Sequence, residues 1–194
     1  PERPTACRLQ ACFYRDRKLA RIPCHQGRLA GNTPNCGLAL MPPRRAKDPY
    51  DWPALLALIQ AEFAFMDGRI DPPSSMHALT PETIALQART GEVWVIGHPP
   101  VACVFLTPEP AALYVGKLAV AASHRRRGLA RALIDLAEIR ARVLGLPALE
   151  LQTRIELTEN QATFRALGFA EVARTAHPGY DRPTSITFRR LVPA

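Results

Sequence analysis

The apolar positions between residues 51 and 68 recur with the period of a helix. Asp51 can cap the N-terminus of such a helix, Pro53 suits its first turn, and Gly68 breaks the pattern. The sequence therefore predicts a first helix in this region. Its expected buried face consists of Leu55, Leu56, Ile59, Phe63 and Met66.

Beyond this helix the pattern changes from helical to β. A turn-rich segment covers residues 67–75, and Thr80 with Pro81 begins a second short helix that extends to about Ala88. Three short runs of β-branched and aromatic residues then predict strands, and the short turns between them predict antiparallel pairing. These strands are predicted over residues 93–96, 101–106 and 113–120.

The last third of the chain alternates between helix and strand. The strongest helical pattern covers residues 125–144 and is stopped by Gly145 and Pro147. A strand, a short helix and a final pair of strands follow, so the predicted fold class is α/β (α+β). The strand covers 148–153, the helix opens with a capping box at Thr158–Gln161 and ends at Gly168, and the final strands cover 169–175 and 184–191.

The composition is that of a globular domain. The chain has 194 residues, of which 47% are apolar, which is enough to bury a core and excludes disorder of the whole chain. The longest apolar stretch, residues 54–66, has 13 residues, whereas a membrane span needs about 18. This excludes a membrane span. No secretory signal pattern is present at the start, so we expect a cytoplasmic protein.

Residues 1–40 differ from the rest in charge and cysteine content. They hold seven of the 25 basic residues, two of the 17 acidic residues and four of the five cysteines. The spacing of these cysteines lacks the paired knuckles of a zinc ribbon, so a zinc or disulfide interpretation is weak. We interpret residues 1–40 as an N-terminal extension, either a tag, an upstream segment or a misplaced start, which precedes a domain over residues 41–194.

The most informative segment, residues 118–131, joins the end of a predicted strand to the strongest predicted helix. Its loop holds Arg125, Arg126, Arg127 and Gly128, at a place where free backbone N–H groups and the positive end of the helix dipole would meet. Such a place binds phosphate, because a glycine lets an anion approach the backbone and arginines add charge-assisted hydrogen bonds. The alternative, a solvated basic helix start, does not explain this order of strand, loop, glycine and helix.

This loop resembles the acetyl-CoA signature of the GNAT family of N-acetyltransferases. In that signature a Gln or Arg is followed by two residues of any kind, a Gly, one more residue and a Gly or Ala, which Arg125 to Ala130 match. The segment Asn160–Phe169 resembles the family's second landmark, a helix from an Asn through an aromatic residue to Gly-Phe. The resemblance covers about residues 50–192. It implies a GNAT-like mixed, mostly antiparallel central sheet with helices on both faces and with strands four and five splayed apart.

The resemblance also implies a position for the cosubstrate acetyl-CoA, in the notch between the splayed strands. A primary amine would attack the thioester directly in a ternary complex, and CoA would leave as a thiolate. No metal is required. The implied cofactor-binding residues are Leu118 and Val120 for the pantetheine arm and acetyl group, Arg125, Arg126, Arg127, Gly128, Leu129 and Ala130 for the pyrophosphate, and Asn160 for the pantetheine, with Phe164 on the same helix.

The catalytic residues are less defined. Phe164 stands where many family members carry a Tyr that protonates the thiolate, and Tyr180 is our candidate substitute, although a thiol with a pKa near 8.5 can leave without an acid. Glu150 is the candidate general base, and a water chain or a histidine stays open as an alternative. The histidines considered are His77, His124 and His177.

The segment 67–75 is equally a substrate lid or a simple connector. It carries our candidate substrate-binding residues, Asp67, Arg69 and Asp71. The two aspartate carboxylates would attract a cationic amine. The expected acceptor is an amine-bearing small molecule or a protein amino group. A homodimer is left open.

Three functions compete at this point. The leading one is an acetyl-CoA-dependent N-acetyltransferase. A CoA-binding regulatory or sensor domain with weak or no catalysis is the alternative, motivated by Phe164. Nucleic-acid binding is disfavoured, because the chain beyond residue 40 has 18 basic and 15 acidic residues.

Overall fold

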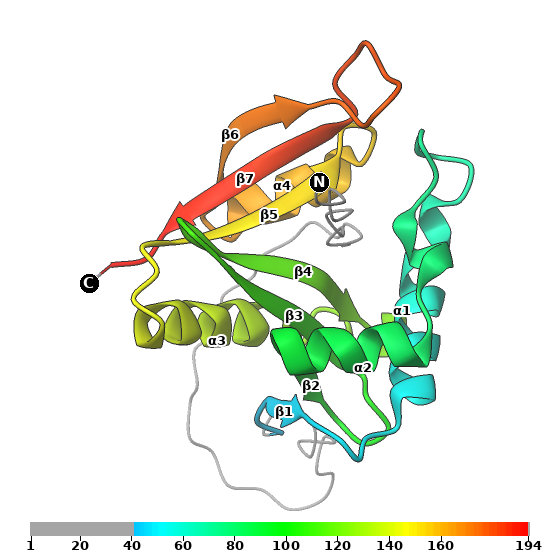
Figure 1. Ribbon diagram of the computed structural model, residues 1–194, viewed down its shortest axis with the longest axis vertical. Helices are drawn as coiled ribbons and strands as arrows, with labels where there is room; N and C mark the ends of the chain where they lie inside the picture. The colour runs from blue at the N-terminus through cyan, green and yellow to red at the C-terminus, as the bar shows by residue number, and fades with distance from the viewer. Residues whose placement is uncertain (1–40, 194) are drawn as a thin grey trace, which may run out of the picture.

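The computed structural model describes residues 41–193. The predicted extension over residues 1–40, with its four cysteines, lies outside the described residues, so the domain boundary stays a prediction. Within the described range, seven strands form one sheet in the order β1-β2-β3-β4-β5-β7-β6 (Figure 1). The strands are β1 (Arg44–Ala46), β2 (Glu92–Ile96), β3 (Ala102–Glu109), β4 (Ala112–Val120), β5 (Ala148–Arg154), β6 (Ala170–Thr175) and β7 (Ser185–Leu191).

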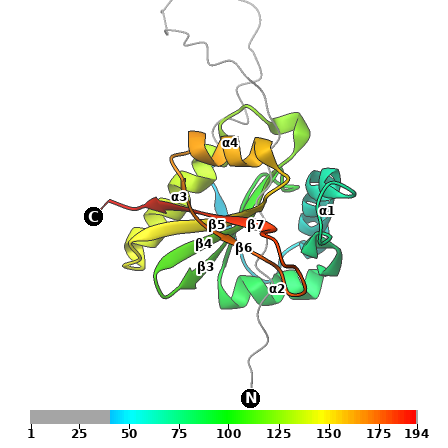
Figure 2. The same cartoon turned by 90° about the horizontal axis from the view of Figure 1, so that it is seen from above.

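Helices cover both faces of the sheet (Figure 2). One face packs against α1 and α2 through a buried cluster that includes Leu55, Ile59 and Phe105, and the other packs against α3 and α4 through a second cluster that includes Leu133 and Phe164. The α-helices are α1 (Trp52–Phe63), α2 (Pro81–Thr90), α3 (Leu129–Val143) and α4 (Thr158–Ala166), with short 3₁₀ turns η1 (Ala64–Met66), η2 (Ser75–Ala78) and η3 (Ala122–His124). None of the described helices is both long and apolar enough to cross a membrane.

The sheet is mixed because one neighbouring pair of strands is parallel. β4 and β5 pair in parallel at only two positions, Leu113 with Leu149 and Tyr114 with Glu150, and all other neighbours are antiparallel. Beyond Tyr114 the two strands diverge, which leaves one edge of β4 without a strand partner in the described part of the chain (Figure 1). The predicted fold class and the splay of strands four and five are confirmed.

Local signals explain most element boundaries. The Asp51 carboxylate caps α1 by accepting a hydrogen bond from the N–H of Ala54 at 3.0 Å, as the sequence predicts. Thr80 caps α2 in a capping box with Thr83. The sequence missed β1, because three residues are too few to show an alternating pattern.

One predicted helix start and one predicted capping box are wrong. The helix predicted from residue 125 begins only at Leu129, because Arg126 and Gly128 have φ values of 63° and 78° that a right-handed helix does not admit. The capping box predicted at Thr158 is absent, because Leu157 occupies the N-cap and Thr158 is already the first helical residue. The loop before α3 is therefore longer than predicted, which exposes more of its backbone.

Candidate cofactor and acceptor site

The notch between β4 and β5 is lined on one side by the free edge of β4. Leu118 and Val120 lie on this strand beyond its last pairing with β5, and their side chains are buried against α3 and α4. A β-strand edge offers backbone N–H and C=O groups to any extended ligand that lies beside it. Both residues therefore lie on the part of β4 that borders the notch.

The strand β4 is irregular where it borders the notch. Val104 of β3 lies opposite two residues of β4, Lys117 and Leu118, because Cys103 pairs with Ala119 and Phe105 pairs with Gly116. This is a β-bulge, and Lys117 adopts a left-handed φ of 43° within it. Lys117 is absent from the residues predicted from sequence, because its contacts with Gln87 and Phe105 come from other elements of the fold.

The loop before α3 has the geometry of an anion site. Gly128 is the N-cap of α3, no side chain of the described residues caps the helix, and a Cβ at Gly128 would meet none of their atoms within 4 Å. Arg126, Arg127 and Gly128 are exposed, whereas Leu129 is buried and Ala130 is half-buried. The backbone at the start of α3 can therefore be approached from solvent, and it suits a pyrophosphate.

Arg125 contacts α1. Its guanidinium donates a hydrogen bond of 2.5 Å to Glu62 Oε2, and the N–H of Ala122 donates to Glu62 Oε1 at 2.9 Å. Glu62 thus connects the loop before α3 to the end of α1 and offsets one arginine charge. Sequence reasoning misses Glu62, because about 60 residues separate it from the loop and no local pattern links them.

The inner part of the notch holds polar groups of β5 and α4. Thr153 is fully buried on β5, and its hydroxyl has no hydrogen-bond partner among the described residues. Asn160 is fully buried on α4. A buried hydroxyl without a partner costs free energy unless a ligand or water satisfies it, so the Thr153 hydroxyl suits a polar group of a bound ligand. Phe164 is also fully buried, between Phe169 and Phe188.

The candidate base Glu150 lies on β5 where the splay begins, directly beside Tyr114. Its side chain is buried, and Arg189 of β7 donates two hydrogen bonds to Oε2, from Nε at 3.1 Å and from Nη2 at 2.6 Å. The arginine keeps this carboxylate oriented. The structure therefore places a carboxylate at the start of the notch.

The candidate substrate-binding residues lie between α1 and α2 and contact other parts of the chain. Asp67 lies 2.9 Å from His77, and Arg69 forms an ion pair of 2.5 Å with Glu159 of α4. The third, Asp71, accepts hydrogen bonds from Tyr180 at 2.5 Å and from Arg182 at 3.3 Å. Asp71 and the candidate acid Tyr180 are thus brought together, and the carboxylate raises the pKa of the Tyr180 hydroxyl.

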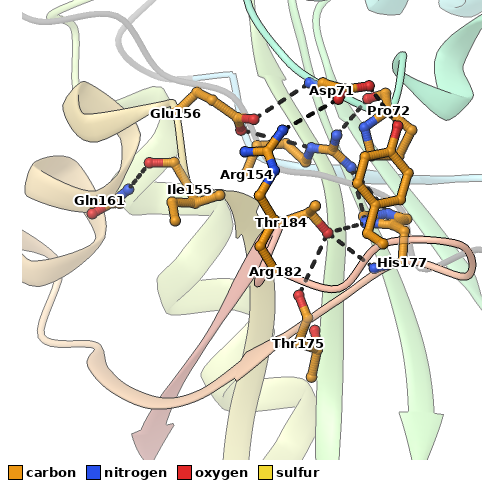
Figure 3. A network of polar contacts seen from close by, with 11 residues as sticks. Asp71, Pro72, Arg154, Ile155, Glu156, Gln161, Thr175, His177, Arg182 and Thr184 are labelled. Carbon is orange, nitrogen blue, oxygen red and sulfur yellow. Dashed lines mark hydrogen bonds and ion pairs between the residues drawn. The ribbon is translucent and has the colours of Figure 1, made fainter.

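Arg154, at the end of β5, connects the surrounding loops (Figure 3). It is 1% exposed, and its Nη2 donates to the carbonyl of Pro72 in the α1–α2 loop. Its Nη1 donates to Nε2 of His177 at 3.0 Å, and the Nδ1 of His177 lies 2.6 Å from the hydroxyl of Thr184. The α1–α2 loop and the β6–β7 loop are therefore joined through β5 on the same side as the Asp71 contacts.

The contact between Arg154 and His177 should make the stability of the protein depend on pH. Burial and the Arg154 charge lower the pKa of His177 below its ordinary value of 6.5, whereas Glu156 opposes this shift. His177 therefore binds a proton more readily in the unfolded chain than in the folded chain. The contribution of neutral His177 to the free energy of unfolding is complete above pH 6.5 and is lost as the pH falls below 6.5. We expect the melting temperature to fall between pH 6.5 and 5, measured by differential scanning calorimetry.

A matched variant isolates this group. The substitution His177→Gln keeps a hydrogen-bonding side chain and removes the titration, so its melting temperature should vary less over the same range. Carboxylates with a lowered pKa, such as Glu92 and Glu159, change the stability of the protein only below their ordinary pKa of 4.5. They therefore do not contribute to a change in melting temperature between pH 6.5 and 5. An equal fall in both proteins would contradict the assignment.

Known proteins share these features. A family model described as the acetyltransferase (GNAT) family matches residues 52–169, more than half of the chain. No curated protein sequence matches. No group of three or more His, Cys, Asp or Glu side chains that could hold a metal ion occurs in residues 41–193.

Solved structures show the same fold. An acetyltransferase of the GNAT family from Staphylococcus aureus matches with a TM-score of 0.62 and 14% identity, over 79% of this chain and 99% of that one. The ribosomal-protein-S18-alanine N-acetyltransferase from Escherichia coli matches with a TM-score of 0.56 and 19% identity, over 77% and 94%. A GNAT family acetyltransferase from Elizabethkingia anophelis with acetyl-CoA bound matches with a TM-score of 0.55 and 14% identity, over 78% and 97%.

Proposed function

The chain belongs to the GNAT family of acetyltransferases, and we propose that it transfers the acetyl group of acetyl-CoA to a primary amine by direct attack in a ternary complex. The observation that carries this proposal is the arrangement of two features of the fold. β4 and β5 part after two residue pairs, and α3, with Gly128 at its N-cap, begins at the end of the loop that follows β4. The strand edge suits an amide-bearing arm and the helix start suits its phosphates.

The residues of this chain divide the work between binding and proton transfer. The backbone N–H groups of residues 126–130 bind the pyrophosphate, and Arg126 and Arg127 add positive charge at the surface. Leu118 and Val120 hold the arm through their backbone, with Thr153 and Asn160 on the opposite side of the notch. When bound, acetyl-CoA supplies an activated acetyl group with a thiolate leaving group. Glu150 accepts the proton that the attacking amine gives up.

The acceptor reaches the site from the side of the α1–α2 and β6–β7 loops. Asp71 offers a carboxylate to a cationic amine there, in place of its contact with Arg182. The similarity to an enzyme that acts on an alanine of a ribosomal protein makes a protein amino group a reasonable acceptor, beside a small amine. Both classes present the same primary amine to the thioester.

The first experiment is a calorimetric titration of the full chain with acetyl-CoA at two salt concentrations, with desulfo-CoA as a control for thiol reactivity. We expect saturable one-to-one binding that weakens at higher salt. A panel of small amines and peptides with free N-termini then follows, with thiol release as the readout. No binding at millimolar acetyl-CoA overturns the proposal. Binding without turnover of any amine favours the regulatory alternative, which Phe164 motivates.

The variant Glu150→Gln tests the general base. It keeps the shape and an acceptor for Arg189 but removes the basic carboxylate, so we expect kcat to fall by about 100-fold or more, as is typical when a general base is lost. The affinity for acetyl-CoA should stay within about twofold, because Glu150 lies away from the phosphate loop. A kcat within about threefold of wild type would assign the proton transfer to water.

The variant Tyr180→Phe tests the candidate acid. The hydroxyl donates to Asp71 and its pKa is raised, which makes it a weaker acid than the thiol it would serve. We therefore expect kcat to fall by less than about threefold, whereas the KM for the amine rises because the contact between the two loops is lost. If kcat instead falls by about 100-fold or more, Tyr180 protonates the thiolate.

A further inference from the structure

We propose that Lys117 is a positioning residue, which holds the bulge of β4 in the conformation that presents the backbone of Leu118 to the acetyl group. The inference rests on the proposed function, because it concerns the acetyl subsite of the same notch. It adds a device that the family signature does not contain, since neither Lys117 nor its partners belong to the residues of that signature.

The bulge places an unusual demand on residue 117. Two residues of β4 face one residue of β3, and Lys117 takes a φ of 43°, a region that residues with a Cβ rarely occupy. Such a conformation persists only where the surroundings fix it. The carbonyl of Lys117 accepts a hydrogen bond from the thiol of Cys103 at 3.4 Å, which is a weak contact. This thiol supplies only a weak hydrogen bond to the bulge.

The Lys117 side chain anchors the bulge to two other elements of the fold. It is 1% exposed, its Nζ donates a hydrogen bond of 2.5 Å to Gln87 Oε1 on α2, and its Nζ lies 4.5 Å from the centre of the Phe105 ring. These partners come from a helix and a neighbouring strand, so they hold the residue from two directions. Anchored in this way, residue 117 fixes the direction in which the next peptide group points.

A buried lysine is an expensive choice if packing is all that is required. Burial lowers the pKa of Lys117 to about 7, because the ammonium loses its hydration, and only the thiol of Cys103 opposes this shift among the described residues. A methionine would fill the same space without that cost. The Lys117 amine is instead held toward Gln87. We take this fixed direction to serve the adjacent acetyl subsite at Leu118.

The test compares two ligands that differ only in the acetyl group. The affinities of the full chain for acetyl-CoA and for CoA are measured by calorimetry in wild type, Lys117→Met and Gln87→Leu. We expect both variants to bind CoA within about twofold of wild type, because the phosphate loop is unchanged. They should bind acetyl-CoA about 5- to 10-fold more weakly, as for the loss of one well-aligned hydrogen bond. The variant Gln87→Glu keeps an oxygen for Nζ and should restore the wild-type ratio.

The outcomes separate this inference from the proposed function. If wild type binds neither ligand, the proposed function fails. If wild type binds both, and folded Gln87→Leu keeps the wild-type ratio of affinities, the positioning role of Lys117 is overturned. Gln87→Leu leaves β4 unchanged and alters a half-buried residue on α2, so it serves even if Lys117→Met does not fold. A uniform loss of affinity for both ligands also contradicts the proposal, because it indicates a general structural role.

Discussion

Replacing Lys117 with Met should raise the free energy of unfolding at pH 7 by about 3 kcal/mol. Burial lowers the pKa of this lysine from 10.5 to about 7, and a change of one in a pKa corresponds to about 1.4 kcal/mol, which gives a cost of about 5 kcal/mol at neutral pH. The methionine loses the hydrogen bond to Gln87 and the contact with Phe105, worth about 1 kcal/mol each. The left-handed φ is equally unfavourable for both residues.

The size of this effect changes with pH in a defined way. Between pH 10.5 and 7 the unfolded chain binds the proton and the folded chain does not, so wild type loses stability as the pH falls through this window and no more below it. The gain from Lys117→Met should therefore be largest at pH 7 and should turn into a loss of about 2 kcal/mol at pH 10.5, where only the lost contacts with Gln87 and Phe105 remain. Urea unfolding at both pH values measures it. An equal gain at both would show that the lysine is charged in the folded protein.

The same variant is expected to be more stable and a poorer acetyl-CoA binder. Such a combination is common where a residue is retained for its effect on a site at the expense of the fold. This combination also distinguishes a specific loss of acetyl-CoA binding from misfolding, because a misfolded variant would lose both its stability and its affinity for acetyl-CoA.

Replacing Gly128 with Glu should abolish binding of acetyl-CoA, with a loss of affinity of at least about 100-fold. The new carboxylate would stand at the positive end of α3, where the pyrophosphate is proposed to lie, and would both repel it and take its hydrogen bonds. Gly128 is exposed, and a Cβ at this position would have no atom of the described residues within 4 Å. The fold should therefore persist. The left-handed φ of 78° costs about 1 kcal/mol for a residue other than glycine.

A matched control lies at the other end of the same helix. Gly145 is also exposed, has a φ of 68°, and its Cβ would likewise meet no atom of residues 41–193 within 4 Å. Gly145→Glu therefore imposes the same backbone strain and charge without approaching the phosphate loop. Calorimetry should show wild-type affinity in Gly145→Glu and none in Gly128→Glu. Equal affinities in the two variants would mean that the signature is misassigned.

The sequence predicted those parts of the site whose signals are local. Gly128 and its neighbours lie within one loop, and the succession of strand, loop and helix is visible in the pattern of apolar residues. Glu62 could not be predicted, because its contacts with Ala122 and Arg125 join elements about 60 residues apart. The same holds for Arg154, whose partner Pro72 lies 82 residues away.

The bulge of β4 shows a different limit of sequence reasoning. The run of β-branched and aromatic residues correctly predicted a strand over 113–120, but a bulge adds one residue to a strand without a change in its composition that the sequence would show. A lysine inside that strand could signal the irregularity only in retrospect, because its partners Gln87 and Phe105 come from other elements. Three-dimensional packing alone reveals why it is buried.

The sparse pairing of β4 with β5 has a mechanical consequence for the whole domain. Two residue pairs join strands β1–β4 to strands β5–β7, so along this line the two parts of the sheet are held mainly by the buried cluster that they share with α3 and α4. The ion pair of Arg69 with Glu159 and the contacts of Asp71 with Tyr180 and Arg182 form a second seam between the same two halves. A ligand that lies along the edge of β4 would contact both parts of the sheet and join them in the gap between β4 and β5. The two parts of the sheet would then open less readily.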